Sequence, residues 1–306
     1  MRTQSWRDTT ANPRSKTRIM GAFVVSQLFL MILSLKPLPA PIFSQPQQSY
    51  GLGAQDVHIH CLDIRKFTAD HYVDAERIMS TAERERAQKF IRGKESYVAS
   101  RWMLRKVLSF YTGLAPEAVN FLRTDKGKPY LPQSEIRFNL SHSGDWALLA
   151  VSKVDLIGVD VEAVSATRDL CGIAESYYHP QEFAQLQELE DEAQTEYFYR
   201  LWTLKEAFLK AIGTGISVGL EKIAFKPECN NLDGCGIKAH IAAELGHDAA
   251  EWQFYQWALR AQVYCAVAAQ SGKPLAVNLF DTLQRQLFLD SQNSTASIAA
   301  YHFVKN

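Results

Sequence analysis

The feature that most constrains this chain is a long amphipathic helix that ends near residue 212. Apolar residues recur there every three or four positions, which predicts one apolar stripe on a helix. Gly213 and Gly215 follow, and glycine takes the left-handed conformation that ends a helix at little cost. Glu206 and Lys210 lie one turn apart and point the same way, which by itself is typical of a surface ion pair. The stripe consists of Tyr197, Leu201, Leu204, Phe208 and Ala211.

Length, charge and cysteine usage narrow the class of protein. The 306 residues suffice for one large or two ordinary domains, and 47% of them are apolar, which supplies a core. A formal net charge of zero argues against broad capture of nucleic acid, which needs a basic face. The five cysteines have no metal-ligand spacing, and their odd number indicates reduced thiols. We therefore expect a cytoplasmic globular protein without a nucleic-acid partner.

Residues 1–50 have the composition of an extension outside the fold. A basic segment precedes an apolar run at 19–35, and a Pro-, Gln- and Ser-rich linker follows at 37–48. The run fits a signal peptide or anchor, lies at the lower limit for a membrane span, and equally fits an extension ahead of the domain. We expect the extension, because the remaining chain has the features of a complete cytosolic domain. Membrane contact is then expected only if residues 19–35 are retained and used.

The first half of the globular region predicts helices between short strands. Ser80 and Glu83 form a capping box that begins a helix carrying Arg84 and Arg86. A second helix carries Arg101 and Arg105, one turn apart. The expected elements are strands at 57–62, 119–122 and 146–151, the capped helix from Ser80, a helix at 94–111 and a turn at 124–130.

A buried strand at 156–162 carries two carboxylates. Asp160 and Glu162 alternate with Val159 and Val161, so both carboxylates point to one face. Like charges on a partly buried face repel each other unless a cation neutralises them. Oxygen ligands suit Mg²⁺, which also borrows substrate phosphates. The strand therefore predicts either a magnesium site or a solvent-facing strand edge.

The stretch R-F-N-L-S-H-S at 137–143 ends a short strand in polar residues. These side chains can all donate hydrogen bonds, although a polar turn between two strands would look the same. The chain has no G-x-S-x-G elbow, so a nucleophilic serine is unsupported.

The second half repeats the order of strands and helices seen in the first. We expect an acidic solvated loop at 188–196, and a tail without clear pattern at 276–306. The repeated order predicts an α+β fold of two similar α/β lobes, 56–157 and 158–275, joined near Gly158, with the active site at their interface. The other expected elements are helices at 167–176 and 179–190 and strands at 223–225, 237–241, 251–259 and 263–269, the last two as a hairpin.

Four motifs in order resemble the 4′-phosphopantetheinyl transferase superfamily. They are G-K-P at 127–129, F-N-L-S-H-S at 138–143, G-V-D-V-E at 158–162 and W-T-L-K-E-A-F-L-K-A-I-G-T-G at 202–215. The span from about 56 to 270 resembles the two-lobed surfactin-type branch rather than the short trimeric holo-acyl-carrier-protein synthases.

The resemblance implies a reaction and its partners. A monomeric cytoplasmic transferase of this kind moves the 4′-phosphopantetheine arm of coenzyme A to a serine of an apo acyl or peptidyl carrier protein. It releases 3′,5′-ADP, with Mg²⁺ as cofactor. Attack on the β-phosphorus needs charge neutralisation and in-line positioning. Fatty acid, polyketide and nonribosomal peptide synthases all use such carriers.

The resemblance also implies roles for individual residues. Asp160, Glu162 and Glu206 would hold Mg²⁺, and Glu206 is also the candidate general base for the carrier serine. Lys210 matches a phosphate-contacting lysine and completes the catalytic pair with Glu206. The implied coenzyme A contacts are Arg86, Arg101, Lys128, Pro129, Ser141, His142 and Lys210.

Three departures from the family pattern bear on binding. Glu83 stands where a second basic residue is expected, and Arg84 is the candidate substitute. Asp145 follows Ser-Gly where a basic residue can occur. Residues 182–196 are acidic, and carriers are usually acidic too, so we expect apolar residues of 165–185 to dock the carrier.

Three rival functions remain open at this stage. A coenzyme A-binding protein without turnover would be expected to lack one of the metal carboxylates. A membrane-tethered interaction protein would depend on residues 1–50. An ATP-dependent phosphotransferase is disfavoured, because the chain has neither a P-loop nor a kinase motif set.

Overall fold

The computed structural model describes residues 43–44, 51–215, 219–227, 237–283 and 300–301. The chain divides into two compact units, Met1–Pro37 and Leu38–Asn306, and all of the described residues belong to the second. The predicted extension at 1–50 therefore lies almost wholly outside the described residues. Within the described ranges, no helix combines the length and the apolar character needed to cross a membrane.

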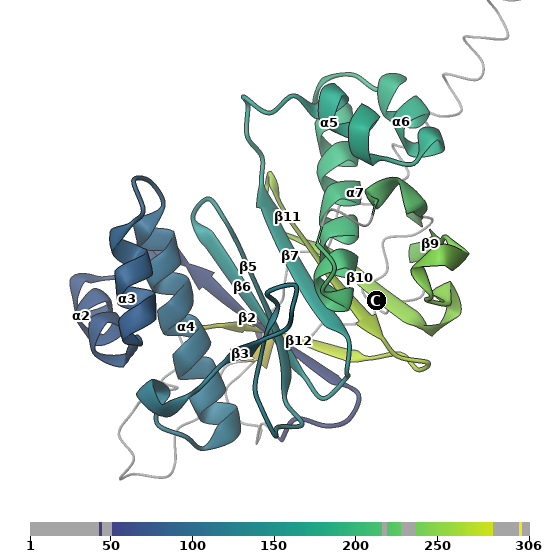
Figure 1. Ribbon diagram of the computed structural model, residues 1–306. Helices are drawn as coiled ribbons and strands as arrows, with labels where there is room; N and C mark the ends of the chain where they lie inside the picture. Colours follow the sequence, from purple (N-terminus) through teal and green to yellow (C-terminus); the bar gives the residue numbers. More distant parts are fainter. Residues whose placement is uncertain (1–42, 45–50, 216–218, 228–236, 284–299, 302–306) are drawn as a thin grey trace, which may run out of the picture. The chain divides into compact units, whose positions relative to one another are not determined.

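A six-stranded mixed sheet, called the large sheet below, organises the first half of the described chain (Figure 1). The predicted strand at 57–62 is confirmed as β2, and it pairs antiparallel with β6. The strand order is β1 (Phe43–Ser44), β13 (Ala300–Tyr301), β12 (Ala276–Asp281), β2 (Asp56–Asp63), β6 (Trp146–Ser152) and β5 (Arg137–Ser143).

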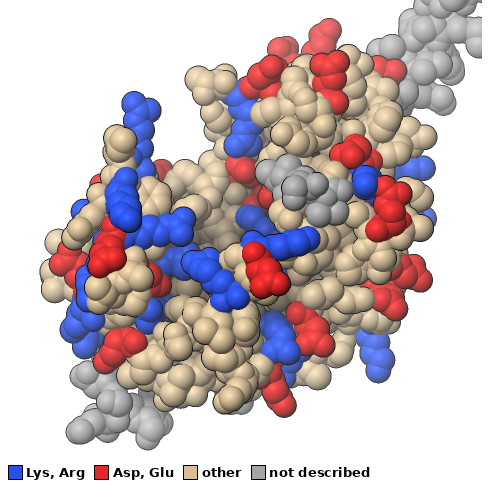
Figure 2. Space-filling view, viewed as in Figure 1, with Lys and Arg blue, Asp and Glu red and all other residues tan. Residues whose placement is uncertain are grey.

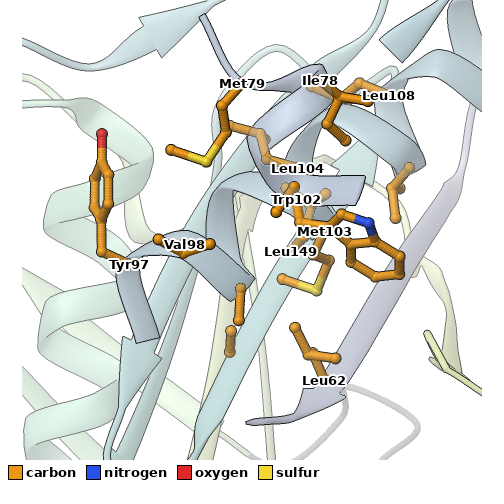
Figure 3. Close-up of a cluster of buried hydrophobic side chains, with 14 of the residues drawn as sticks. Leu62, Ile78, Met79, Tyr97, Val98, Trp102, Met103, Leu104, Leu108 and Leu149 are labelled. Atoms are coloured by element: carbon orange, nitrogen blue, oxygen red, sulfur yellow. The ribbon is translucent and has the colours of Figure 1, made fainter. Parts of the chain in front are cut away.

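Three helices lie in the first half of the described chain: α2 (Ala69–Ile78), α3 (Thr81–Gln88) and α4 (Lys94–Thr112). Of these, α4 packs against the large sheet, and α2 and α3 pack on α4. The predicted capping box is present, because the Ser80 hydroxyl accepts from the Glu83 amide and the Glu83 carboxylate accepts from the Ser80 amide. The apolar face of α4 fills the space between α2 and the sheet (Figure 3). Its buried side chains include Val98, Trp102, Met103, Leu104 and Leu108.

One predicted strand in this half is wrong. Only residues 122–123 form a strand, β3 (Leu122–Arg123), which pairs with β4 (Pro129–Tyr130) across the predicted turn. Val119 is buried instead, and its carbonyl oxygen accepts a hydrogen bond from the Arg105 guanidinium. A buried cation therefore takes the backbone group that a sheet partner would need.

A second sheet, called the small sheet below, has the order β10 (Trp252–Arg260), β11 (Val263–Gln270) and β7 (Ile157–Ala163). The predicted hairpin of β10 and β11 is confirmed. The long helix α7 (Asp191–Ile212) packs on this sheet (Figure 1). The predicted glycine Gly213 caps its end. Gly213 has a φ of 71°, and its amide donates to the carbonyl of Leu209. The α+β class is thus confirmed.

The acidic segment at 188–196 is not a loop, as the sequence analysis expected. It begins α7 at Asp191, after α5 (Leu170–Tyr177) and α6 (Pro180–Gln187). Carboxylates stabilise the first turn of a helix, because the amide dipoles there leave a partial positive charge. Asp191 and Glu192 occupy that turn. Acidity at this place therefore favours a helix start.

Part of the expected C-terminal tail is a strand. Residues 276–281 form β12, which runs parallel to β2 within the large sheet. Val277 and Leu279 are buried there. The remaining pair is β8 (Ile223–Pro227) with β9 (Ile237–Ile241), close to its predicted places. The lobe boundary near Gly158 stays a prediction.

Candidate active site

The site begins with the close packing of α7 on β7. Gly158, Asp160 and Glu162 share one face of β7 because side chains alternate along a strand. At Gly158 that face meets the backbone of α7. A Cβ there would come 3.0 Å from the Cα of Ala211 and much nearer still to the Ala207 carbonyl oxygen. Only glycine therefore allows the helix so close to the strand.

The rise per residue of strand β7 and of helix α7 places their functional residues beside one another. The four residue steps from Gly158 to Glu162 span roughly 13 Å of strand. The eight steps from Trp202 to Lys210 span about 12 Å of helix, and every fourth side chain there shares a face. The Trp202 indole donates to Glu162 at 3.2 Å, and the Lys210 ammonium donates to Asp160 at 2.6 Å. The helix thus runs antiparallel to the strand.

Asp160 lies at the centre of the site and is 2% exposed. Its Oδ1 accepts from Lys210 Nζ and, at 2.9 Å, from the Ser141 hydroxyl of β5. Its Oδ2 is buried and has no hydrogen-bond partner among the described residues. Burial raises the pKa of Asp160, and the positive charge of Lys210 opposes that shift. Lys210 therefore pairs with Asp160 and not, as its spacing first indicated, with Glu206.

Glu162 has both carboxylate oxygens occupied by neighbouring donors. Ser143 donates to Oε2 at 3.1 Å, Arg168 donates to the same atom at 3.3 Å, and Trp202 donates to Oε1. Burial is the main cause that raises the pKa of Glu162, and the negative charge of Asp160 raises it further. The positive charge of Arg168 lowers this pKa.

Glu206 is the least satisfied carboxylate of the three. Its Oε1 is buried, and no group in the described part of the chain bonds to it. Burial first, and then the negative charges of Asp160 and Glu162, raise its pKa to about 7, against the opposing charge of Lys210. A carboxylate with a pKa near neutrality is suited to taking up a proton.

The donor set fits a hard cation with two protein ligands. Among the residues that the structure describes, no three Asp, Glu, His or Cys side chains form a group that could hold a metal. Glu162 is occupied, but Asp160 Oδ2 and Glu206 Oε1 are both buried and unpartnered. Mg²⁺ commonly takes one or two protein carboxylates and completes its shell with water and substrate phosphates. Two free carboxylate oxygens are therefore sufficient.

A basic cluster lies on the α3–α4 side of the molecule. The guanidinium carbons of Arg86 and Arg101 lie 5.8 Å and 5.3 Å from the centre of the Tyr97 ring. The Nε of Arg101 is buried without a partner, and burial lowers the pKa of Arg101. Figure 2 shows Lys and Arg side chains around the hollow between this side and that of α7. Such a cluster can receive a phosphate group.

Glu83 stands on α3 where the family pattern has a basic residue, and Arg84 is its candidate substitute. Both side chains have structural partners. The Glu83 carboxylate accepts from the buried Arg105 at 2.7 Å. The Arg84 guanidinium donates to the carbonyls of Glu76 and Met79, where α2 ends. The Arg84 guanidinium thus already has backbone partners at the end of α2, and its part in phosphate binding stays a prediction.

The surroundings differ from those expected for the residues that were predicted to lie in loops, which are Lys128, Pro129, Ser141 and His142. The Lys128 ammonium donates to the carbonyls of Ala211 at 2.6 Å and Ile157 at 3.2 Å, and burial lowers its pKa to about 8. Pro129 lies beside it in β4. Ser141 and His142 lie within β5 rather than in a turn, because the strand continues to Ser143. Desolvation is the main cause that lowers the pKa of His142, so its ring is neutral near pH 7.

Sequence reasoning missed three residues that hold Glu162: Ser143, Arg168 and Trp202. Two signals were available. Ser143 continues the alternation of Ser141, and Trp202 precedes Glu206 and Lys210 by one and two turns. Arg168 had no such signal, because it reaches Glu162 from the connection between β7 and α5. Lys205, whose role the sequence left open, is fully buried and pairs with Glu182 at 2.7 Å.

Two cavities lie away from the carboxylates of Asp160, Glu162 and Glu206. One of about 800 Å³ is lined by the end of α4 and residues 131–136, and one of about 540 Å³ lies among α2, α3 and α4. Arg84 lines the second cavity, and the other predicted site residues line neither.

Comparison with known proteins identifies the class to which this site belongs. Residues 156–268 match the model of the 4′-phosphopantetheinyl transferase superfamily, and residues 66–154 match that of the 4′-phosphopantetheinyl transferase N-terminal region. The chain belongs to this superfamily, which confirms the resemblance seen in the motifs.

Individual relatives match over different shares of their length. A 4′-phosphopantetheinyl transferase of Bacillus subtilis is 33% identical over 176 residues, which are 56% of this chain and 73% of that protein. The transferase HetI of Nostoc sp. is 39% identical over 47% of this chain. An L-aminoadipate-semialdehyde dehydrogenase-phosphopantetheinyl transferase of Mus musculus is 30% identical over 64% of this chain and 68% of its own. The chain spans 63% of the Nostoc protein, just under two thirds.

A solved structure, the holo-[acyl-carrier-protein] synthase of Thermotoga maritima, covers 49% of this chain and 83% of that one. Its TM-score is 0.29 at 15% identity, and a likeness this weak carries no argument.

Proposed function

We propose that this chain transfers the 4′-phosphopantetheine arm of coenzyme A to a serine of an apo carrier protein and releases 3′,5′-ADP. Membership of the superfamily and the activities named for its relatives support this. The observation that carries the proposal is the pair of buried, unpartnered oxygens on Asp160 and Glu206, beside the Lys210 ammonium. These groups suit a pyrophosphate and its cation.

Coenzyme A would bind through its phosphates along the hollow in Figure 2. Arg86 and Arg101 both lie close to the Tyr97 ring, and their two guanidinium groups would bind a phosphate monoester. Lys210 and a neutral His142 would serve the pyrophosphate. The Lys128 ammonium already donates to two carbonyl oxygens. Lys128 would therefore contribute through its backbone, and the neighbouring Pro129 would lie beside the adenine.

The chain's own residues can move the proton and stabilise the charge. Without a cation the pKa of Glu206 is about 7, so at neutral pH a large fraction of this carboxylate is deprotonated and able to take the serine proton, and a bound cation would raise that fraction. The Lys210 ammonium would stabilise the negative charge that develops on the leaving phosphate. Mg²⁺, held by Asp160 and Glu206 with Glu162 nearby, would neutralise the pyrophosphate. Positioning then supplies much of the rate.

The carrier would dock beside α5. Tyr177 is 37% exposed, and its ring packs edge-on against Trp202, which in turn holds Glu162. This apolar contact fits the expectation that apolar residues of 165–185 dock the carrier. We place the enzyme in the cytoplasm as a monomer of the surfactin-type branch, without a nucleic-acid partner.

The test is incubation with coenzyme A, Mg²⁺ and a panel of apo carrier proteins, read by intact mass. A pantetheinyl mass gain on at least one carrier is expected. No gain on any carrier would remove the proposal, and coenzyme A binding without a gain would favour the non-catalytic alternative. Glu206→Gln should stop transfer while coenzyme A still binds. Glu135→Gln, on an exposed carboxylate that pairs only with Lys153 in the described chain, should change neither.

A further inference from the structure

The large and small sheets meet at two edge strands, β5 and β7, that share no backbone hydrogen bonds in the sheet pairing. Side chains of β5 bridge the gap instead. Asn139, Ser141 and Ser143 accept from the amides of Val159, Val161 and Ala163, at 2.9, 3.3 and 3.2 Å. Each acceptor lies 20 residues before its donor, so the two strands run parallel.

The residue types on β5 match the residues they face on β7. A hydroxyl can accept one hydrogen bond and donate another. Ser141 donates to Asp160, and Ser143 donates to Glu162, while each accepts from the next amide. At the first position the corresponding β7 residue is Gly158, which has no carboxylate, and there β5 carries an amide acceptor, Asn139.

We propose that these three side chains form a polar joint between the two sheets, and that Ser143 is a positioning residue for Glu162. The same hydroxyl that fastens the sheets also orients the carboxylate. The separation of the sheets and the placement of the acidic groups are therefore coupled. This inference rests on the proposed function only for its effect on turnover.

The coupling explains why polar side chains occupy every second position of β5 at residues 139, 141 and 143. Residues 139, 141 and 143 share one face of β5 because side chains alternate along a strand. Phe138 on the opposite face is buried in the core beneath α4. A hydroxyl is needed at 143 because the Ala163 amide and the Glu162 carboxylate both bond to it. An apolar side chain of equal size would satisfy neither.

The test compares Ser143→Thr with Ser143→Val, two variants of nearly equal shape that differ in the hydroxyl. Amide hydrogen exchange over residues 161–163 reports the joint directly and needs no activity. We expect exchange at Ala163 at least about tenfold faster in the valine variant than in the threonine variant. With saturating coenzyme A and Mg²⁺, kcat should fall about tenfold while the KM for the carrier stays within about twofold, since small misplacements of a site lower the rate.

The matched control is Ser152→Ala. Its hydroxyl bonds to the Asp56 carbonyl and the Val154 amide, away from β7, so exchange at Ala163 and kcat should both match the wild type. Equal exchange and equal kcat in the valine and threonine variants would overturn the proposal. If the valine variant does not fold, Ser143→Ala takes its place. Wild-type protein without transfer activity would refute the proposed function, and the exchange comparison would still decide the joint.

Discussion

Replacing Gly158 by alanine tests the close approach of α7 to β7 on which the site depends. The added Cβ would meet the Ala207 carbonyl oxygen and the Ala211 amide nitrogen well under 3.0 Å, a separation that real Cβ contacts do not show. Both are backbone atoms of a buried helix, so no side chain can turn aside. The helix must retreat by about 1 Å, since overpacked cores respond by backbone shifts.

The size of the effect follows from that shift. Overpacking of a core costs about 1–3 kcal/mol, and backbone collisions place Gly158→Ala near the upper end. For a domain of this size, 3 kcal/mol lowers Tm by about 6–12 °C. A retreat of about 1 Å would also lengthen the 2.6 Å bond from Lys210 to Asp160 beyond hydrogen-bonding range, and misplacement of that order lowers kcat about 100-fold.

Thermal unfolding and the pantetheinyl-transfer assay measure the two effects separately. Gly272→Ala is the control, because a Cβ there meets no atom within 4 Å and its backbone is not left-handed. It should leave both Tm and kcat near wild type. If Gly158→Ala were as stable as the control, the packing argument would be wrong. If stability fell but kcat did not, the helix position would not govern the site.

Three further predictions concern the charged groups. The pKa of Glu206 is raised from 4.5 to about 7, so in metal-free protein its carboxyl stabilises the fold below pH 4.5 and loses that contribution as the pH rises through 7. Glu206→Gln should therefore be more stable than wild type by about 2 kcal/mol at pH 8 and equal to it at pH 4, by thermal melts in chelator. Lys205→Met leaves Glu182 buried and unpaired and should cost about 3–5 kcal/mol by chemical denaturation, against under about 1 kcal/mol for Lys222→Met in an exposed pair. Similar losses for the two lysine variants would contradict the burial argument. Chelation should abolish transfer, and added Mg²⁺ should restore it.

The sequence predicts elements well where one local pattern decides them. The end of α7 follows from its apolar stripe and from Gly213, and the shared face of Asp160 and Glu162 follows from alternation in β7. The beginning of α7 was missed because its acidic residues have no apolar period, although they suit a helix start.

The partners of the site residues could not be predicted in the same way. Ser141 looked like a turn residue because nothing local shows that β5 lies beside β7, the edge strand of another sheet. The Lys128 ammonium reaches Ala211, a residue 83 positions away. Such contacts depend on how distant segments pack, and sequence periodicity carries no information about that.

The place of β12 has a consequence for synthesis of the protein. This strand pairs in parallel with β2, although about 220 residues separate the two partners, so a nascent chain cannot close the large sheet until almost all of it has left the ribosome. Until then β2 presents an open edge with Val57 and Ile59 on it, and open apolar edges recruit other strands. A fragment ending before residue 276 would keep that edge permanently. The first half of the chain therefore cannot complete the large sheet by itself, and its expression alone should yield aggregates.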